Sequence, residues 1–188
     1  MPEPLVSTIE RHLHALVDGY PDRHIGRAGN IGAVDHAESV FVDHGWSVES
    51  VVFDALDCLT GPTSLSVGGE TYAVEPGPYT TAADVSAPLL PIESVAALED
   101  AELAGTVVLL HGAIAADQLF PKSFDFIDAP EHRRIYELLE RGGPLAVVGA
   151  TGQGGGMGGG LYPYPLIEDG DFDFPNAFTT DIVGIELA

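Results

Sequence analysis

Two short apolar runs, separated by a helical segment, constrain the second half of this chain more than any other feature. Residues 106–110 (TVVLL) and 145–148 (LAVV) are continuous apolar runs of the kind found in strands buried on both faces. Between them, Asp128 is predicted to cap a helix that has Pro130 at its first position and ends at Gly142-Gly143. A strand, a helix and a strand in this order predict a right-handed crossover with at least one parallel strand pair. The expected fold class is therefore α/β, with α+β features mixed in.

The first 75 residues predict two amphipathic helices followed by short strands. Residues 4–18 have helical apolar spacing, and Asn30 is predicted to cap a second helix that ends at Gly45. Residues 48–53 alternate as in a strand, and residues 64–67 and 70–74 flank Gly68-Gly69 as in a β-hairpin. The apolar residues expected to face inward on the helices are Leu5, Ile9, Leu13, Leu16, Val17, Val34, Ala37, Val40 and Phe41.

A change of composition after residue 75 predicts a second lobe, residues 76–188. Four prolines between Pro76 and Pro91 mark the crossing, and a short strand is expected near residues 85–92. Seven glycines between Gly152 and Gly160 predict a flexible loop. A strand is expected at residues 182–187, and its position at the end of the sequence indicates a fold that has been cut short.

The charge balance predicts the solution behaviour of the protein. The chain has 29 acidic and 7 basic residues, Lys122 being the single lysine, so its formal charge is −22. Such a surface repels itself at low ionic strength, whereas at about 1 M salt the Debye length is only about 3 Å. We therefore expect a cytoplasmic protein of a high-salt organism, with no visible signal peptide and no affinity for nucleic acid or membranes.

Several motif-like patterns fail at identifiable positions. The glycines at 154, 156 and 159 have dinucleotide-site spacing, but Pro163 and Pro165 forbid the helix that would hold the phosphates, so we favour a loop. Three aspartates have the first spacings of a calcium loop, yet Phe174 and Thr180 stand where glycine and glutamate are required. These aspartates are a weak cation candidate, and a solvated extended segment is the favoured reading: Asp169, Asp171 and Asp173.

The sequence contains no complete catalytic constellation. Its seven histidines show no ligand spacing; His36 is isolated, and His111 at a strand end is interpreted as structural in preference to a site residue. No His-x-Asp and no Gly-x-Ser-x-Gly occur. Cys58 has no partner at zinc-ligand spacing, so a small buried hydrophobe is favoured over a ligand. No catalytic residue, metal ligand or cofactor is therefore assigned.

Five segments taken in order resemble the front of an M28-family zinc aminopeptidase. They are residues 23–30 (RHIGRAGN), 45–48 (GWSV), Phe53, 109–112 (LLHG) and 162–172 (YPYPLIEDGDF). The first resembles that family's Arg-x-x-Gly-Ser-x-Gly-Asn loop through Arg23, Gly26, Gly29 and Asn30, with Arg27 in place of the serine. Residues from about 76 to 178 resemble the protease-associated domain that many members insert.

This resemblance implies that residues 1–75 form a helix-helix-strand part of a peptidase fold. It implies that residues 76–188 form a protease-associated-like, β-rich lobe with a crossover helix. The family's two zinc ions and its general base are held by residues beyond the inserted domain, so zinc is expected only in a full-length member. The implied role is a non-catalytic segment that shapes or covers a substrate cleft, with a peptidase catalytic domain as partner and a peptide as substrate. The residues expected at a mobile lip of the cleft are Gly158, Gly159, Tyr162 and Tyr164, although packing beside proline is the favoured interpretation of the two tyrosines.

Two further interpretations remain open. The chain could be a stand-alone module that uses exposed sheet edges to form a homodimer or to hold a peptide. It could also be an independent enzyme whose site the motifs do not reveal. Sedimentation separates the first of these from the accessory segment, since a tight dimer would favour the module.

Overall fold

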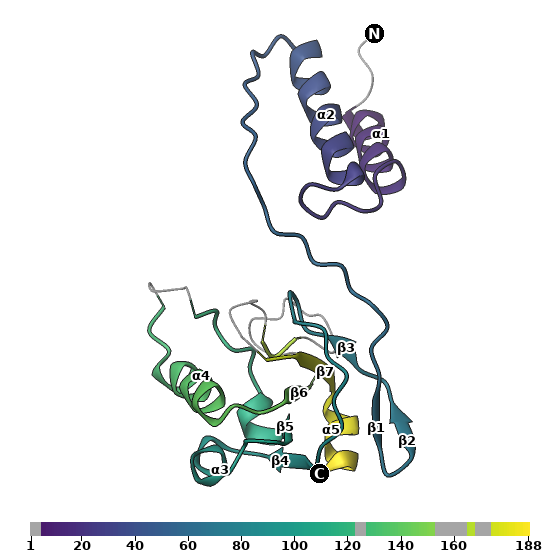
Figure 1. The fold of residues 1–188 in the computed structure, drawn as a ribbon. Helices are drawn as coiled ribbons and strands as arrows, with labels where there is room; N and C mark the ends of the chain where they lie inside the picture. The colour runs from purple at the N-terminus through teal and green to yellow at the C-terminus, as the bar shows by residue number, and fades with distance from the viewer. Residues whose placement is uncertain (1–4, 123–126, 153–164, 168–173) are drawn as a thin grey trace. The chain divides into compact units, whose positions relative to one another are not determined.

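The structure is a computed structural model that describes residues 5–122, 127–152, 165–167 and 174–188 (Figure 1). The chain divides into two compact units, Met1–Leu59 and Thr60–Ala188, which are described separately. The change of lobe that the sequence places near Pro76 falls on strand β3 (Glu75–Pro76) of the second unit. The predicted α/β class with α+β features is confirmed, because helices accompany a mixed sheet.

The first unit contains the two predicted helices, α1 (Leu5–Asp18) and α2 (Ala28–Asp43). The predicted cap of α2 is wrong. Arg27 occupies the N-cap position without a side-chain cap bond, and Asn30 lies inside the helix. The Asn30 Oδ1 accepts a hydrogen bond from the Gly26 backbone N–H at 3.2 Å, so this side chain closes the preceding loop instead of starting the helix.

The apolar side of α1 faces solvent within this unit. Neither helix buries a single residue, and the residues expected to face inward on α1 are between 48% and 74% exposed, with Leu16 half-buried as the exception. The prediction that this side packs inward is therefore wrong, as it is for Val34 and Phe41 of α2. We call this set the apolar stripe of α1: Leu5, Ile9, Leu13 and Val17.

Small and polar residues occupy the contact between the two helices. A Cβ atom on Gly32 of α2 would lie 2.5 Å from the ring of Tyr20, so the missing side chain lets that ring pack against the helix. His12 of α1 lies next to His36 of α2, with Nδ1 and Nε2 separated by 3.2 Å. The helices thus meet through a face of α1 other than its apolar stripe.

The strand expected at residues 48–53 is not present. This segment is extended and unpaired, and Val51, Val52 and Phe53 are 76%, 96% and 72% exposed. Alternation of apolar residues requires a neighbouring strand to become a sheet, and none is formed by the described part of the first unit.

The second unit is built on a five-stranded mixed sheet. Its strand order is β3-β7-β6-β5-β4, where β4 is Leu89–Ile92, β5 is Val107–Leu110, β6 is Ala146–Thr151 and β7 is Asn176–Thr180. Strands β4 to β7 are parallel and follow chain order across the sheet, and β3 pairs antiparallel with β7. The predicted strands at 106–110 and 145–148 and the parallel crossover between them are confirmed.

The predicted hairpin is also confirmed. Strands β1 (Leu65–Val67) and β2 (Glu70–Tyr72) pair antiparallel around Gly68 and Gly69. Both glycines have positive φ, 61° and 90°, which a two-residue primed turn requires.

Helices cover both faces of the five-stranded sheet (Figure 1). Helices α3 (Val95–Asp100) and α4 (Pro130–Gly142) pack on one face through Leu98, Ile135 and Leu139. On the other face a smaller cluster contains Val74, Leu109 and Val148, with Leu187 of helix α5 (Asp181–Leu187) against it. A short 3-10 helix, Gly112–Ala115, follows β5 and adds Ile114 to the larger cluster.

The ends of α4 and α5 correct two predictions. Ala129, not Asp128, is the N-cap of α4; Asp128 instead binds Arg133 at 2.7 Å, while Pro130 begins the helix as predicted. Residues 182–187, predicted as a strand, form α5, whose N-cap hydroxyl on Thr180 accepts the Val183 N–H at 3.2 Å. The indication of a cut fold that depended on that strand is therefore withdrawn.

Candidate functional site

The loop between α1 and α2 contains the motif residues that the resemblance singled out, and the structure gives each of them a local structural task. Arg23 donates hydrogen bonds to the carbonyls of Leu16 and Tyr20, which satisfies acceptors at the C-terminal end of α1. Gly26 has a φ of +80°, and a Cβ on Gly29 would lie 2.0 Å from the carbonyl oxygen of Asp22. The motif therefore specifies a tight interhelical loop.

Arg27 joins this loop to the extended segment that follows the helices. Its Nε and Nη2 donate to the two carboxylate oxygens of Asp57 at 2.8 and 2.9 Å, a bidentate pairing. Nη2 also donates to the carbonyl of Cys58 at 2.7 Å, and Nη1 donates to Asp22 Oδ2 at 3.0 Å. The arginine that replaces the family's serine thus fixes residues 57–58 beside the loop.

The electrostatics agree with a structural role for this cluster. Hydrogen bonds from His24 first and Arg27 second lower the pKa of Asp22 to about 2. The Arg27 guanidinium lowers the pKa of Asp57, and the two carboxylates raise the pKa of Arg27. Asp22, Asp57 and Arg27 are therefore held in their charged forms at neutral pH, so none of these three is poised to exchange a proton in catalysis.

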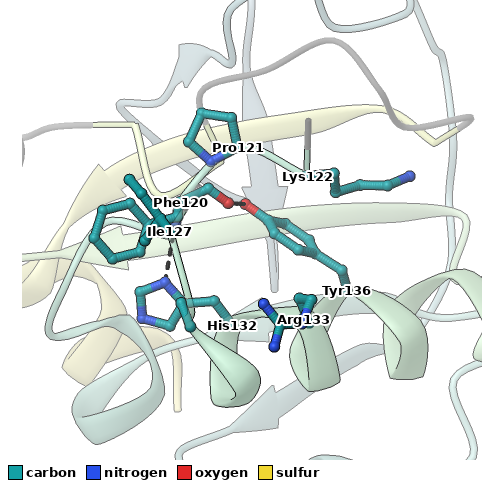
Figure 2. A pocket seen from close by; sticks show the side chains of 8 residues that line it. Phe120, Pro121, Lys122, Ile127, His132, Arg133 and Tyr136 are labelled. Carbon is teal, nitrogen blue, oxygen red and sulfur yellow. Dashed lines mark hydrogen bonds between the residues drawn. The ribbon is translucent and has the colours of Figure 1, made fainter. Parts of the chain in front are cut away.

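A pocket among the described residues lies beside α4 (Figure 2). His132 Nδ1 accepts the backbone N–H of Phe120 at 3.0 Å, and Tyr136 donates its hydroxyl to the Phe120 carbonyl at 2.8 Å. Figure 2 shows both side chains turned from the same helix toward the backbone of Phe120. Burial lowers the pKa of His132, which favours the neutral ring that this hydrogen bond requires.

The positive side chains at this pocket are already paired. Lys122 Nζ lies 2.5 Å from Glu140, and Arg133 Nη2 lies 2.7 Å from Asp128. Lys122, Arg133, the Tyr136 hydroxyl and one nitrogen of His132 are all engaged in internal bonds. At this pocket the 120–122 segment is attached to α4.

Histidines outside this pocket are mostly bound locally. His14 pairs with Asp18 at 2.9 Å, and His44 Nδ1 lies 2.7 Å from the Val40 carbonyl. His12 and His36 are the exception, since they lie 24 positions apart in sequence and meet between the helices. This pair could not be predicted from sequence, because no spacing pattern encodes it. The two rings meet only because α2 folds back against α1.

No set of three or more His, Cys, Asp or Glu side chains that could hold a metal occurs in the part of the chain that the structure describes. The described residues therefore do not supply the ligands of the dinuclear zinc centre that the resemblance implies for a full-length member. The cation candidates Asp169, Asp171 and Asp173 and the lip candidates Gly158, Gly159, Tyr162 and Tyr164 lie outside the described residues.

No helix in the described ranges has the length and apolar character that crossing a bilayer demands. No protein-family model matches the chain, and a search of curated proteins finds no match.

A search of solved structures finds a likeness to the aminopeptidase from Aneurinibacillus sp. strain AM-1, with a TM-score of 0.56 and 18% sequence identity. The match covers 95% of this chain and 39% of the aminopeptidase chain. The chain has a peptidase-like fold. At this identity the likeness concerns the fold alone, and the chain spans well under half the length of the protein it matches.

Proposed function

We propose that the chain is the non-catalytic front part of an M28-type zinc aminopeptidase, with the second unit acting as a protease-associated-like lobe that shapes or covers a substrate cleft. The observation that carries the proposal is the exposed apolar stripe of α1 in a chain whose fold matches 39% of an aminopeptidase. The metal ligands, the general base and the peptide substrate then belong to the longer protein.

The exposure of the apolar stripe supports the inference that α1 packs against a part of the protein outside this unit, for a physical reason. An amphipathic helix normally gains its stability by burying its apolar side, and each fully buried aliphatic side chain contributes about 1.5–3 kcal/mol. In α1 the apolar residues recur at helical spacing, as for burial, yet they remain exposed within the first unit. An apolar helix side that is not buried within its own unit is typical of a helix that packs against another part of a larger fold.

The second unit supports the lobe assignment through its own compact core. Its sheet is covered on both faces, and its core leucines, including Leu98, Leu109 and Leu139, are fully buried. Such a unit can hold its shape independently of the stripe. That is the behaviour expected of an inserted lobe.

The stand-alone module is the second candidate, and the free edge of β4 argues against its strand-addition form. Val107 donates its N–H to the Pro88 carbonyl and His111 donates to the Ile92 carbonyl, so the even-numbered residues of β4 face β5. Pro91 therefore lies on the open edge, where it offers no N–H. Strand β3 at the opposite edge is two residues long and ends in Pro76. Both edges are poor templates for an added strand.

The decisive experiment is to read the native coding sequence beyond the codon for Ala188 and to compare residues 1–188 with the full product. We expect the frame to continue into a His-x-Asp and further acidic ligands, and the full product to hydrolyse aminoacyl substrates with zinc in high salt. Residues 1–188 should be inactive in the same assay and should sediment without a tight dimer. Turnover by residues 1–188, or a stop codon together with a tight dimer, would refute the proposal.

A further inference from the structure

The contact between His12 and His36 joins the two helices of the first unit. Both histidines are half-buried, whereas His14 on α1 and His44 at the C-cap of α2 are exposed. The ring planes are inclined at 58° with centroids 5.4 Å apart, so the rings do not stack. Nδ1 of His12 and Nε2 of His36 are the two nitrogens in contact.

The separation of those nitrogens matches a ligand pair. Nδ1 of His12 and Nε2 of His36 lie 3.2 Å apart. Two imidazole nitrogens bound to one tetrahedral zinc ion at about 2.0–2.1 Å lie about 3.3 Å from each other. An ion could thus be held with a change of only about a tenth of an ångström in that separation.

The surroundings favour a bound cation over a bare contact. The chain has a formal charge of −22, so its surface attracts positive ions. Tyr20 stands beside His36 with ring centroids 6.2 Å apart, and its position is fixed by the absence of a side chain on Gly32. The helices bury no residue between them, so a crosslink would supply stability that the first unit does not obtain from a core.

We propose that His12 and His36 form a two-histidine site for a divalent transition ion of the zinc, nickel or copper class, which crosslinks α1 to α2. Imidazole nitrogen is a preferred ligand of these ions. Binding needs both rings neutral, with their protons on His12 Nε2 and His36 Nδ1, so it shifts a tautomer and releases no proton. Water completes the coordination, because no third His, Cys, Asp or Glu joins the pair among the described residues. The site is therefore structural.

Zinc alone is the probe for the test. Residues 1–188 are dialysed against zinc in concentrated potassium nitrate, since chloride complexes the ion, at a pH above the range in which histidines titrate. We expect one ion per chain. The variants His12→Gln and His36→Gln should bind about tenfold or more weakly, since even loss of an outer-shell partner costs that much. Far-UV circular dichroism checks that both variants keep their helices.

The matched controls are His14→Gln and His44→Gln, one on each helix, which should bind zinc like the parent. Absence of binding by the parent, or equal weakening in all four variants, would overturn the proposal. If a site variant loses its helices, imidazole resonances of the parent decide. Zinc must shift the signals of His12 and His36 and leave that of His14 unchanged; any other pattern refutes the site.

Discussion

Truncation of the same residue type on two helices should cost very different amounts of stability. Leu139 of α4 is 0% exposed in the larger core cluster, whereas Leu13 of α1 is 55% exposed. Leucine to alanine removes three carbons, worth about 2.4 kcal/mol when fully buried at about 0.8 kcal/mol per carbon. With the added cavity, Leu139→Ala should cost about 3–5 kcal/mol. Leu13→Ala leaves no cavity and should cost about 1 kcal/mol or less, since under half of the side chain is covered.

Hydrogen exchange read by mass spectrometry is the suitable assay, because it reports the two compact units separately. Each variant is compared with the parent in concentrated potassium chloride, and the opening free energies are taken from peptides of α1 and α4. A loss in Leu13→Ala as large as that in Leu139→Ala would mean that the apolar stripe of α1 is buried in this chain. The argument for a missing packing partner would then fail.

Three other perturbations have clear expected outcomes. Gly184→Ala should destabilise by up to about 2 kcal/mol in urea unfolding, because a Cβ there would lie 2.3 Å from that of Ala150; overpacking costs about 1–3 kcal/mol against a helix-propensity gain of about 1 kcal/mol. Adding Ala150→Gly should restore most of the loss, and failure to do so would refute the clash. Burial lowers the pKa of His132 below its ordinary value of 6.5, so the stability that the neutral ring contributes is complete above pH 6.5 and is lost as the pH falls below that value. His132→Asn keeps an acceptor for the Phe120 N–H, so its free energy of unfolding should fall less than that of the parent between pH 6.5 and 5. The thermal midpoint should rise steeply with potassium chloride, and a maximum in dilute buffer would contradict the charge argument.

The sheet of the second unit could be predicted from sequence because its signals are local. Continuous apolar runs gave β5 and β6, Pro130 and Gly143 bounded α4, and Gly68-Gly69 gave the hairpin. In each case one short segment contains both the pattern and its stop signal, so no distant contact has to be known.

The errors occurred where the partner of a segment decides its structure. Residues 182–187 are mostly apolar, as in a short buried strand, but Thr180 caps a helix there and Gly184 lets it approach Ala150. Residues 48–53 alternate as in a strand, yet no described strand lies beside them. The site residues divide in the same way: the loop motif was visible in sequence, whereas the contact of His12 with His36 depends on how two helices fold back on each other.

The exposed apolar stripe has a consequence for synthesis on the ribosome. The first unit is synthesised before the second, and at about 5–20 residues per second residues 60–188 need roughly 6–26 s to follow. Under the proposed function the packing partner of the stripe is made later still, so the nascent helices present an uncovered apolar surface for at least that interval. The dense negative charge of the chain, which keeps neighbouring nascent copies apart, then acts as the protein's own safeguard against aggregation before assembly is complete.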